Sequence, residues 1–326
     1  MIARTLCFSS VGKLSVKLEQ LVWESDGGEV RTMPVEDIGF VILESEKISV
    51  TAACLQLLAD KNVALVVCDK SHTPSAQLLP YSANLTSQET IEAQLTATEA
   101  VQGRLWRQIC RRKILNQAAL MRALGAEKNI VSMKVLAGQV KNGDPANCEG
   151  QAARMYFHAL GPEGFKRDRE GDWPNAPLNY GYAILRAAVA RALVGSGLCC
   201  FWGIHHHNRY NPFCLADDVM EPYRPYVDQY VLGKVRPFDV PLKELTKEMK
   251  TRLLQMLTCD VHIGECRRPL MVALTYTTAS LAKYYLGKGD ELLHVGAESL
   301  GLGKGGGDAA VADEAASLVG QHGLTM

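Results

Sequence analysis

One segment of the chain reads Gly203-Ile-His-His-His-Asn-Arg-Tyr-Asn-Pro-Phe213 and continues, after a cysteine, as Leu215-Ala-Asp-Asp-Val-Met-Glu-Pro-Tyr-Arg-Pro225. It concentrates imidazoles and carboxylates in a polar turn that leads into a helix. Asp218 and Glu221 are three residues apart and therefore share one face of that helix. Carboxylates combined with imidazole suit Mg²⁺ or Mn²⁺ better than zinc, which prefers cysteine and histidine. The segment predicts a helical domain with a divalent-metal site, and such a metal beside arginines is what phosphodiester chemistry requires.

The composition of the 326 residues limits the class of protein. The chain is 47% hydrophobic and 21% charged, as in soluble globular proteins. It has no apolar run of about eighteen residues, so we expect no membrane span, and Met1–Cys7 lacks the apolar core of a signal peptide. None of the ten cysteines forms a C-x-x-C pair. We therefore expect reduced thiols, no disulfide framework and a cytoplasmic location.

The formal net charge is zero, but the charges are distributed unevenly. Residues 100–170 hold thirteen Lys or Arg against six Asp or Glu, whereas residues 289–326 hold six acidic residues and one lysine. A basic middle with an acidic end is compatible with a nucleic-acid partner. A solvated basic face is nevertheless the commoner origin of such a run.

Residues 1–80 have the pattern of a β-rich domain. Lys13–Leu18 alternates polar and apolar residues, as a half-buried strand does. The apolar runs Ile38–Leu43 and Val63–Cys68 predict buried strands, and residues 49–61 predict one helix between them. The fold class that follows is α+β, with a small N-terminal β-rich domain and a larger all-helical domain after it.

The remainder of the chain is expected to be a linker, a helical domain and a tail. The polar residues 81–88 form the linker, and residues 89–288, which carry the histidine and carboxylate motifs, form the catalytic domain. Its expected helices cover residues 92–124, 145–157, 178–198, 215–232, 242–257 and 269–285. Residues 289–326, rich in glycine and acidic residues, predict a low-complexity, loosely ordered tail.

Four motifs follow one another in the helical part. They are Glu149-Gly-x-Ala-Ala-x-x-Tyr-Phe, Leu178-Asn-Tyr-Gly-Tyr-Ala-Ile-Leu, Gly203-Ile-His-His, and Leu215-Ala-x-Asp-x-Met-Glu-Pro-Tyr-Arg-Pro-x-Val-Asp228. On these motifs the chain resembles the CRISPR-associated integrase family, the nuclease subunit of the CRISPR spacer-acquisition complex. The resemblance covers about residues 1–286. The doubled histidine and the Asn-x-Tyr-Asn-Pro-Phe stretch are most similar to the subgroup from type II loci.

The resemblance implies a catalytic site. The family's catalytic metal ligands, which hold Mg²⁺ or Mn²⁺, fall on Glu149, His206 and Glu221. Many members have Asp at the third position, so Glu221 is a permitted variant. Asp218 and His205 are expected to support the site. The choice of His206 follows the Gly-x-x-His spacing, and His205 and His207 stay open as alternatives.

The resemblance also implies a reaction and partners. The 3′-hydroxyl of a short DNA fragment attacks a phosphodiester at the edge of a CRISPR repeat. The expected partners are double-stranded DNA, a second copy of the chain that pairs through the N-terminal domain, and a small ferredoxin-like companion protein. Arginines expected to contact DNA are Arg104, Arg107, Arg111, Arg112, Arg209 and Arg224.

Alternatives remain beside this interpretation. A lone glutamate such as Glu149 near a helix start usually favours the helix dipole. The basic residues 104–113 also suit a solvated helix face, and the cysteines at 199, 200 and 214 make zinc an alternative. At the level of function, the alternatives are a catalytically silent DNA-binding scaffold and an unrelated metal-dependent phosphodiesterase acting on RNA or branched DNA.

Overall fold

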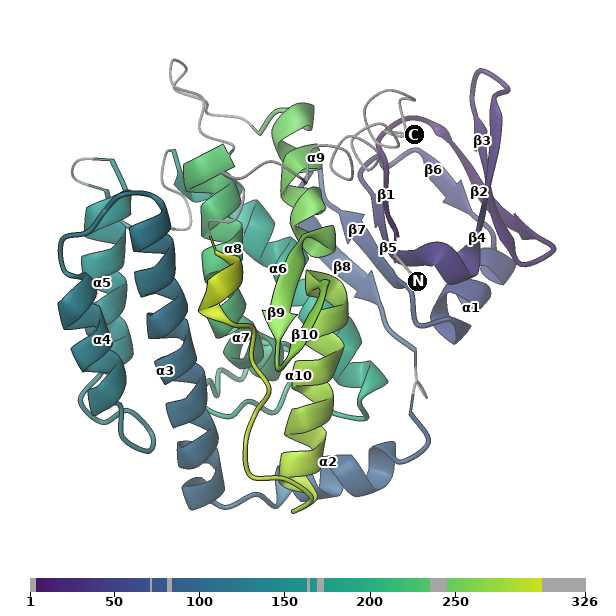
Figure 1. The fold of residues 1–326 in the computed structure, drawn as a ribbon. Coiled ribbons are helices and arrows are strands. Elements are labelled where there is room, and N and C mark those ends of the chain that lie inside the picture. Colours follow the sequence, from purple (N-terminus) through teal and green to yellow (C-terminus); the bar gives the residue numbers. More distant parts are fainter. Residues whose placement is uncertain are drawn as a thin grey trace. The chain divides into compact units, whose positions relative to one another are not determined.

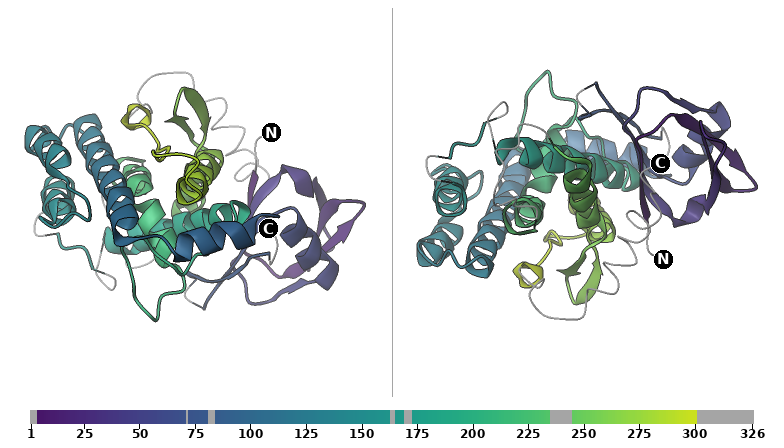
Figure 2. Two further views of the ribbon diagram at one scale, coloured as in Figure 1. Left: turned by 90° about the horizontal axis from the view of Figure 1, so that it is seen from below. Right: turned by 90° about the horizontal axis from the view of Figure 1, so that it is seen from above.

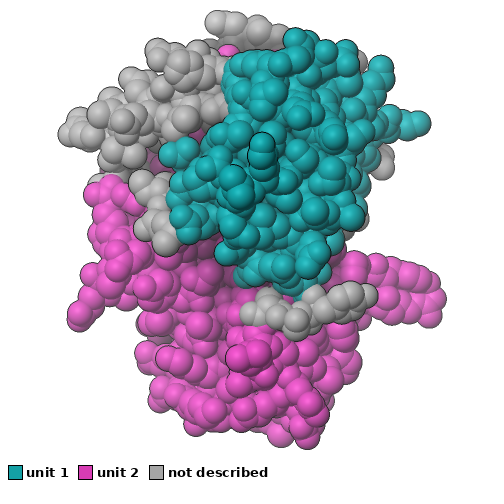
Figure 3. Space-filling model, turned by 90° about the vertical axis from the view of Figure 1, so that its right-hand side faces the viewer, with its two compact units in different colours: residues 1–83, 305–326 teal, residues 84–304 magenta. Residues whose placement is uncertain are grey.

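The structure is a computed structural model, and it describes residues 4–70, 72–80, 84–162, 165–168, 173–234 and 245–300. The chain divides into two compact units, one of residues 1–83 with 305–326 and one of residues 84–304 (Figure 3). Strands dominate the first unit and helices the second (Figure 1). The predicted α+β class is confirmed. No helix within the described ranges has both the length and the apolar character needed to cross a membrane.

The described residues of the first unit form two four-stranded sheets, one α-helix and a short 3-10 helix over Val35–Asp37. One sheet has the order β1-β5-β7-β8, in which β5 pairs in parallel with both neighbours and β8 is antiparallel. Its strands are β1 (Arg4–Phe8), β5 (Ile38–Leu43), β7 (Ala64–Cys68) and β8 (Pro74–Leu78). All six residues of β5 are buried, as expected of a central parallel strand with both faces covered.

The second sheet of this unit has the order β4-β3-β2-β6. Its strands are β2 (Gly12–Lys17), β3 (Gln20–Ser25), β4 (Val30–Pro34) and β6 (Ile48–Val50). Phe8 and Trp23, from different sheets, pack with ring centroids 4.8 Å apart in one apolar core. The helix α1 (Ala52–Asp60) begins where Thr51 accepts a hydrogen bond from the Cys54 amide at 3.3 Å.

The second unit is built around the long helix α3 (Glu99–Ala123), which lies beside α4 (Ile130–Gln139) and α5 (Cys148–Leu160) (Figures 1 and 2). The other helices are α2 (Ser87–Leu95), α6 (Asn175–Gly195), α7 (Cys214–Met220), α8 (Arg224–Asp228), α9 (Lys247–Gln255) and α10 (Leu270–Tyr285). A single helix was expected over 92–124, but two are found. The Thr98 side chain accepts from the Val101 amide and starts α3 anew, a cap that hydrophobic periodicity does not reveal.

The expected helix over 215–232 is divided into short segments. A 3-10 turn, η2 (Glu221–Tyr223), separates α7 from α8, and a π-helical turn over Gln229–Lys234 follows. The prolines explain the first break, because a proline inside a helix removes a backbone donor and clashes with the preceding turn. Pro222 and Pro225 each lie at the start of the next segment, where a proline is tolerated.

Two features differ from an all-helical domain with a loose tail. β9 (Asp260–Ile263) and β10 (Cys266–Pro269) form an antiparallel hairpin. Residues 289–300 pack on the helices: Val295 is fully buried and bridges to Ile263, and the Leu292 amide donates to Gln108 of α3 at 2.9 Å. The composition of residues 289–326 predicts a loosely ordered tail, but residues 289–300 are ordered against the helices. The few apolar side chains of this segment, among them Leu292 and Val295, are enough to anchor it. Residues 301–326 lie outside the described residues.

Gly181 permits a close approach of α6 and α8. A Cβ atom at this position would overlap the Val227 side chain. We expect Gly181→Ala to lower the free energy of unfolding by about 1–3 kcal/mol, because an overpacked core must shift. Denaturant unfolding would measure the loss, and adding Val227→Ala should recover part of it.

Gly138 on α4 provides the control, because a Cβ there would meet nothing within 4 Å. Gly138→Ala should stabilise the protein by about 0.5–1 kcal/mol through helix propensity. Equal effects at Gly138 and Gly181 would contradict the close-packing explanation.

Candidate functional site

The candidate site lies where the ammonium group of Lys113 contacts two carboxylates. Lys113 belongs to α3, and its Nζ forms ion pairs with Glu149 of α5 and with Oε2 of Glu221 in η2, the latter at 2.5 Å. The Lys113 and Glu221 side chains are 10% and 7% exposed, and that of Glu149 is 25% exposed. Glu149 and Glu221, which are far apart in sequence, thus converge on one positive charge.

Local sequence places Glu149 in the first turn of α5. The Asp144 carboxylate accepts from the amides of Cys148 and Glu149 at 3.0 and 2.9 Å, and Asn147 accepts from Gly150 at 3.1 Å. These side chains satisfy amides that a helix start leaves without partners. Because capping is done by Asp144 and Asn147, the Glu149 side chain is available to Lys113. Glu149 therefore does more than interact with the helix dipole, because its carboxylate forms an ion pair with Lys113.

Glu221 is held from two sides. Its Oε1 lies 2.9 Å from Arg224 Nε, three residues later. The fully buried Asn116 of α3 donates to the Pro222 carbonyl at 2.8 Å and so anchors η2 on the long helix. Burial alone would raise the pKa of Glu221, but Arg224 and Lys113 outweigh burial and lower it. Glu221 is therefore a buried carboxylate that stays ionised.

Asp218 organises the histidine segment. It is fully buried, and its Oδ2 accepts from the amides of Ile204 and His205 at 2.6 and 2.9 Å. Its Oδ1 lies 2.5 Å from His206 Nδ1. This hydrogen bond raises the pKa of His206, although partial burial opposes the shift. Because Nδ1 is bound to Asp218, Nε2 is the nitrogen of His206 available as a ligand.

The three consecutive histidines have different surroundings. His205 stacks on the buried Trp106 of α3, with ring centroids 4.3 Å apart and planes within 4°, while His206 meets the edge of the same ring at 5.8 Å. His207 lies edge-on to Trp202 at 6.3 Å. Partial burial lowers the pKa of His205. The arrangement favours His206 as the ligand, with Trp106 fixing the segment from the α3 side.

The side chains of the site are of types that bind a divalent cation. Within the described residues, however, no three His, Cys, Asp or Glu side chains lie close enough together to hold one in their present positions. Glu149 and Glu221 already converge on a cation, the Lys113 ammonium. The charge of Glu221 also contributes to the raised pKa of His206, so the imidazole lies within its electrostatic reach. Two carboxylates and one imidazole are a donor set that Mg²⁺ or Mn²⁺ accepts.

The cysteines considered for zinc make other contacts. The Cys200 thiol donates to the Ala190 carbonyl, and the Cys214 thiol donates to the carbonyls of Asn208 and Asn211. All ten cysteines are free thiols in the structure.

Another buried carboxylate, Asp228, lies close to Arg224. The hydroxyl groups of Tyr156 and Tyr182 donate to it at 2.7 and 2.5 Å. Burial raises the pKa of Asp228 to about 6, even though both tyrosine hydrogen bonds act in the opposite direction. The Arg224 guanidinium lies over the Tyr182 ring at 4.6 Å. This network couples the position of Arg224, and through it Glu221, to the helix core.

The arginines proposed as DNA contacts fall into two groups. Arg104, Arg107 and Arg111 are exposed on one face of α3, as their spacing of three and four residues requires. Arg209 is also exposed, with its guanidinium 4.5 Å from the centre of the Tyr210 ring. Arg112 and Arg224 are only partly exposed. Lys113, which the sequence groups with the stripe, is buried because its position points toward the carboxylates.

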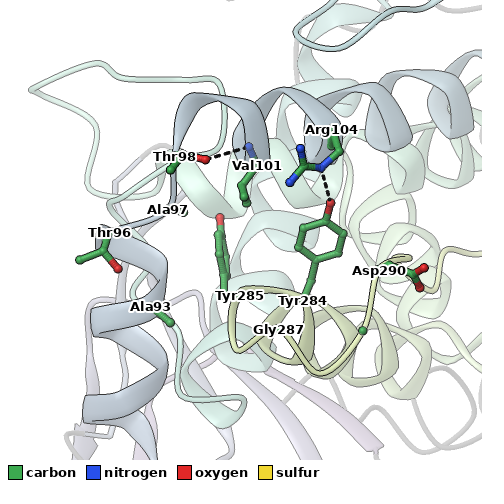
Figure 4. Close-up of a pocket in the computed structure, with 11 residues that line it drawn as sticks. Ala93, Thr96, Ala97, Thr98, Val101, Arg104, Tyr284, Tyr285, Gly287 and Asp290 are labelled. Atoms are coloured by element: carbon green, nitrogen blue, oxygen red, sulfur yellow. Dashed lines mark hydrogen bonds between the residues drawn. The ribbon is translucent and has the colours of Figure 1, made fainter.

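A pocket of about 490 Å³ opens between α2, α3 and α10 (Figure 4). Arg104 Nε donates to the Tyr284 hydroxyl at 3.3 Å on one wall. Arg104 is nine residues before Lys113, or about 13 Å along the axis of α3. None of the carboxylates or histidines of the candidate site lines this pocket.

The sequence is similar to a known protein family over most of its length. The family model "CRISPR associated protein Cas1" matches residues 6–256. A CRISPR-associated endonuclease Cas1 from Neisseria meningitidis serogroup C is 38% identical over 265 residues, which are 80% of this chain and 84% of that protein. A second relative of the same description, from Pyrobaculum aerophilum, is 30% identical over 237 residues, covering 67% and 76% of the two chains.

Solved structures share the fold at low sequence identity. A casposase bound to an integration product superposes with a TM-score of 0.75 at 18% identity, covering 89% of this chain and 92% of that one. A CAS1 protein from Thermotoga maritima gives a TM-score of 0.67 at 16% identity, with 89% and 99% covered.

The matches place the chain among the CRISPR-associated proteins. Within that class it belongs to the Cas1 family, because the family model spans well over half of its length.

Sequence reasoning missed several residues that build the site. Lys113 was grouped with the exposed basic stripe, and Asp144, Asn116 and Trp106 were given no role. The one available signal was the apolar periodicity of α3, which places residues 106, 110 and 113 on its inner face. A lysine on that face predicts a buried ion pair but does not name the partner.

We expect Asp218→Asn to lower the pKa of His206, because the carboxylate hydrogen bond is the main cause of its rise. Because the pKa of His206 is raised in the folded state, the His206–Asp218 pair stabilises the fold fully at pH values below 6.5, the ordinary pKa of histidine. The stabilisation is lost as the pH rises through the pKa of His206 in the folded protein. The loss of thermal stability in the variant should therefore be greater in acid than in alkaline buffer. NMR titration of the histidine C–H signals would measure the pKa.

Asp217→Asn is the matched control. Asp217 is the neighbouring carboxylate, it binds Asn211, and its charge is the smallest of the causes named for His206. An equal pKa change in both variants would contradict the role assigned to Asp218.

Proposed function

We propose that this protein is a divalent-metal-dependent DNA integrase and endonuclease of CRISPR adaptation, which inserts short DNA fragments into a repeat array. The observation that carries the proposal is the convergence of Glu149 and Glu221 on the Lys113 ammonium, together with a histidine, His206, that Asp218 holds within the electrostatic reach of Glu221. Family membership supports the assignment, since curated relatives are described as endonucleases. The fold is also that of a casposase solved with an integration product.

Each residue of the site has a distinct proposed task. Glu149, His206 through Nε2, and Glu221 would hold Mg²⁺ or Mn²⁺. Bound there, the cation would favour deprotonation of an attacking hydroxyl and stabilise charge on the phosphate. Arg224 keeps Glu221 ionised and in place, and Asp218 fixes the tautomer and direction of His206.

In the proposed reaction, the 3′-hydroxyl of a DNA fragment attacks a phosphodiester at the edge of a repeat. A new P–O bond forms to the fragment while the P–O bond to the departing 3′-oxygen of the repeat strand breaks. One phosphodiester replaces another, so the chemistry needs no protein nucleophile and no ATP. Choice of the insertion site then depends on DNA contacts and on the cost of bending the DNA.

The proposed partners are DNA, a second copy of the chain joined through the N-terminal β-rich domain, and a small ferredoxin-like companion. Only the companion among these partners has support from a relative of this fold, which occurs in a solved Cas6-RT-Cas1–Cas2 complex with a TM-score of 0.69 at 19% identity, covering 91% of this chain and 36% of that one. The cytoplasm is the compartment we propose, because the free thiols suit a reducing environment.

The test is a strand-transfer assay with the protein, its companion, Mn²⁺, a short duplex and a repeat-bearing plasmid. Glu149→Gln should reduce plasmid-linked product at least about 100-fold, because loss of a direct ligand exceeds the ~10- to 100-fold cost of losing a residue behind one. Chelation of the metal and a duplex blocked at its 3′ ends should abolish the product. Glu127→Gln, an exposed glutamate after α3, should react as wild type.

The alternatives give different results in the same assay. A silent scaffold would bind DNA but form no product with any metal. An unrelated phosphodiesterase would cleave RNA or branched DNA without needing a free 3′-hydroxyl. Either result would contradict the proposed integrase.

The exposed arginine face of α3 should contribute phosphate contacts. We expect Arg107→Gln combined with Arg111→Gln to weaken DNA binding for all sequences, because each lost phosphate contact reduces counterion release. The slope of log K against log [salt] should fall in magnitude by about 0.9 per contact. Fluorescence anisotropy over a salt series would measure the slope. An unchanged slope, matching that of the exposed Lys134→Gln control on α4, would identify a merely solvated face.

A further inference from the structure

Lys113 is a cation built into the proposed metal site. Its Nζ contacts both carboxylates that would bind the metal, and the side chain is only 10% exposed. A buried lysine is rarely tolerated unless paired, and here the pairing carboxylates are also the expected ligands.

We propose that Lys113 is an internal counterion that competes with the divalent cation for Glu149 and Glu221. The inference rests on the proposed metal-dependent function. An ammonium group and a metal ion cannot both occupy the contact point of the same two carboxylates. Metal binding must therefore displace the ammonium or share the carboxylates with it, so the metal affinity is weaker than the same ligands would reach alone. In the absence of metal, Lys113 keeps two like charges together.

The charges of the cluster extend this inference to DNA. Lys113 and Arg224 balance Glu149 and Glu221, so these four side chains are together neutral before a metal binds. A divalent cation adds two positive charges to a site with little exposure. A DNA phosphate can compensate that excess and pair with the displaced ammonium. Metal and DNA should thus bind cooperatively, and Lys113 is the residue that couples them.

The test measures Mn²⁺ affinity by calorimetry for the wild type and for Lys113→Met, which removes the charge and keeps the length of the side chain. The variant should bind Mn²⁺ at least about tenfold more tightly, within the range of ordinary coupling between sites. Lys113→Arg, which retains the charge, should stay close to wild type. Lys128→Met, an exposed lysine after α3, should have no effect.

Thermal unfolding supplies a second measurement that does not depend on activity. Without metal, Lys113→Met should melt at a lower temperature than wild type, because two carboxylates lose their shared partner. Added Mn²⁺ should raise its melting temperature more than that of wild type. Where Lys113→Met does not fold without metal, Lys113→Gln, whose amide can still donate to both carboxylates, serves for the same comparison.

The outcomes separate this inference from the proposed function. Equal or weaker Mn²⁺ binding by Lys113→Met would overturn the proposed competition. The metal site itself would still be supported if Glu149→Gln abolished Mn²⁺ binding. No binding by any variant would overturn both. A 3′-blocked duplex should tighten Mn²⁺ binding by a larger factor in wild type than in Lys113→Met, and equal factors would overturn the coupling to DNA.

Discussion

The ammonium group of Lys113 lies between two carboxylates that come from different helical segments. Burying one of these carboxylates without a partner would be costly, and burying both side by side would be more so. Their common contact with Lys113 offsets part of that cost and joins α3, α5 and η2 at one point. The rest of the helical unit depends on this arrangement. Asn116 anchors η2 to α3, and Asp144 directs the first turn of α5.

The histidine segment follows a similar physical rule, since a buried carboxylate is surrounded by donors. Asp218 accepts from successive backbone amides and from the imidazole of His206, and it therefore fixes the backbone and the ring together. Trp106 stacks on His205 from α3. The Cas1 family's motif thus combines residues that would contact metal with residues that hold them. In this chain Asp218 belongs to the second kind by its contacts.

Much of the fold was predictable because hydrophobic periodicity reports local burial. The strands β2, β5 and β7, and the helices α1, α6 and α10, occur close to their expected positions. The predictions failed where capping or tertiary contacts decide: Thr98 divides a continuous amphipathic pattern, and Pro222 divides the next. The hairpin of β9 and β10 and the anchored residues 289–300 were also missed, because neither segment has a pattern that is stable alone.

The sequence by itself determined the α+β class, the family motifs and the residue types of the site, since these depend on periodicity and on short-range spacing. It did not reveal which charges meet. Only the tertiary structure brought Lys113 to Glu149 and Glu221, made Asp218 a partner of His206, and diverted Arg224 from the surface to Glu221. The physical reason is that an ion pair is a contact between distant segments. A linear pattern records that a lysine faces inward, but not which carboxylate makes its burial tolerable.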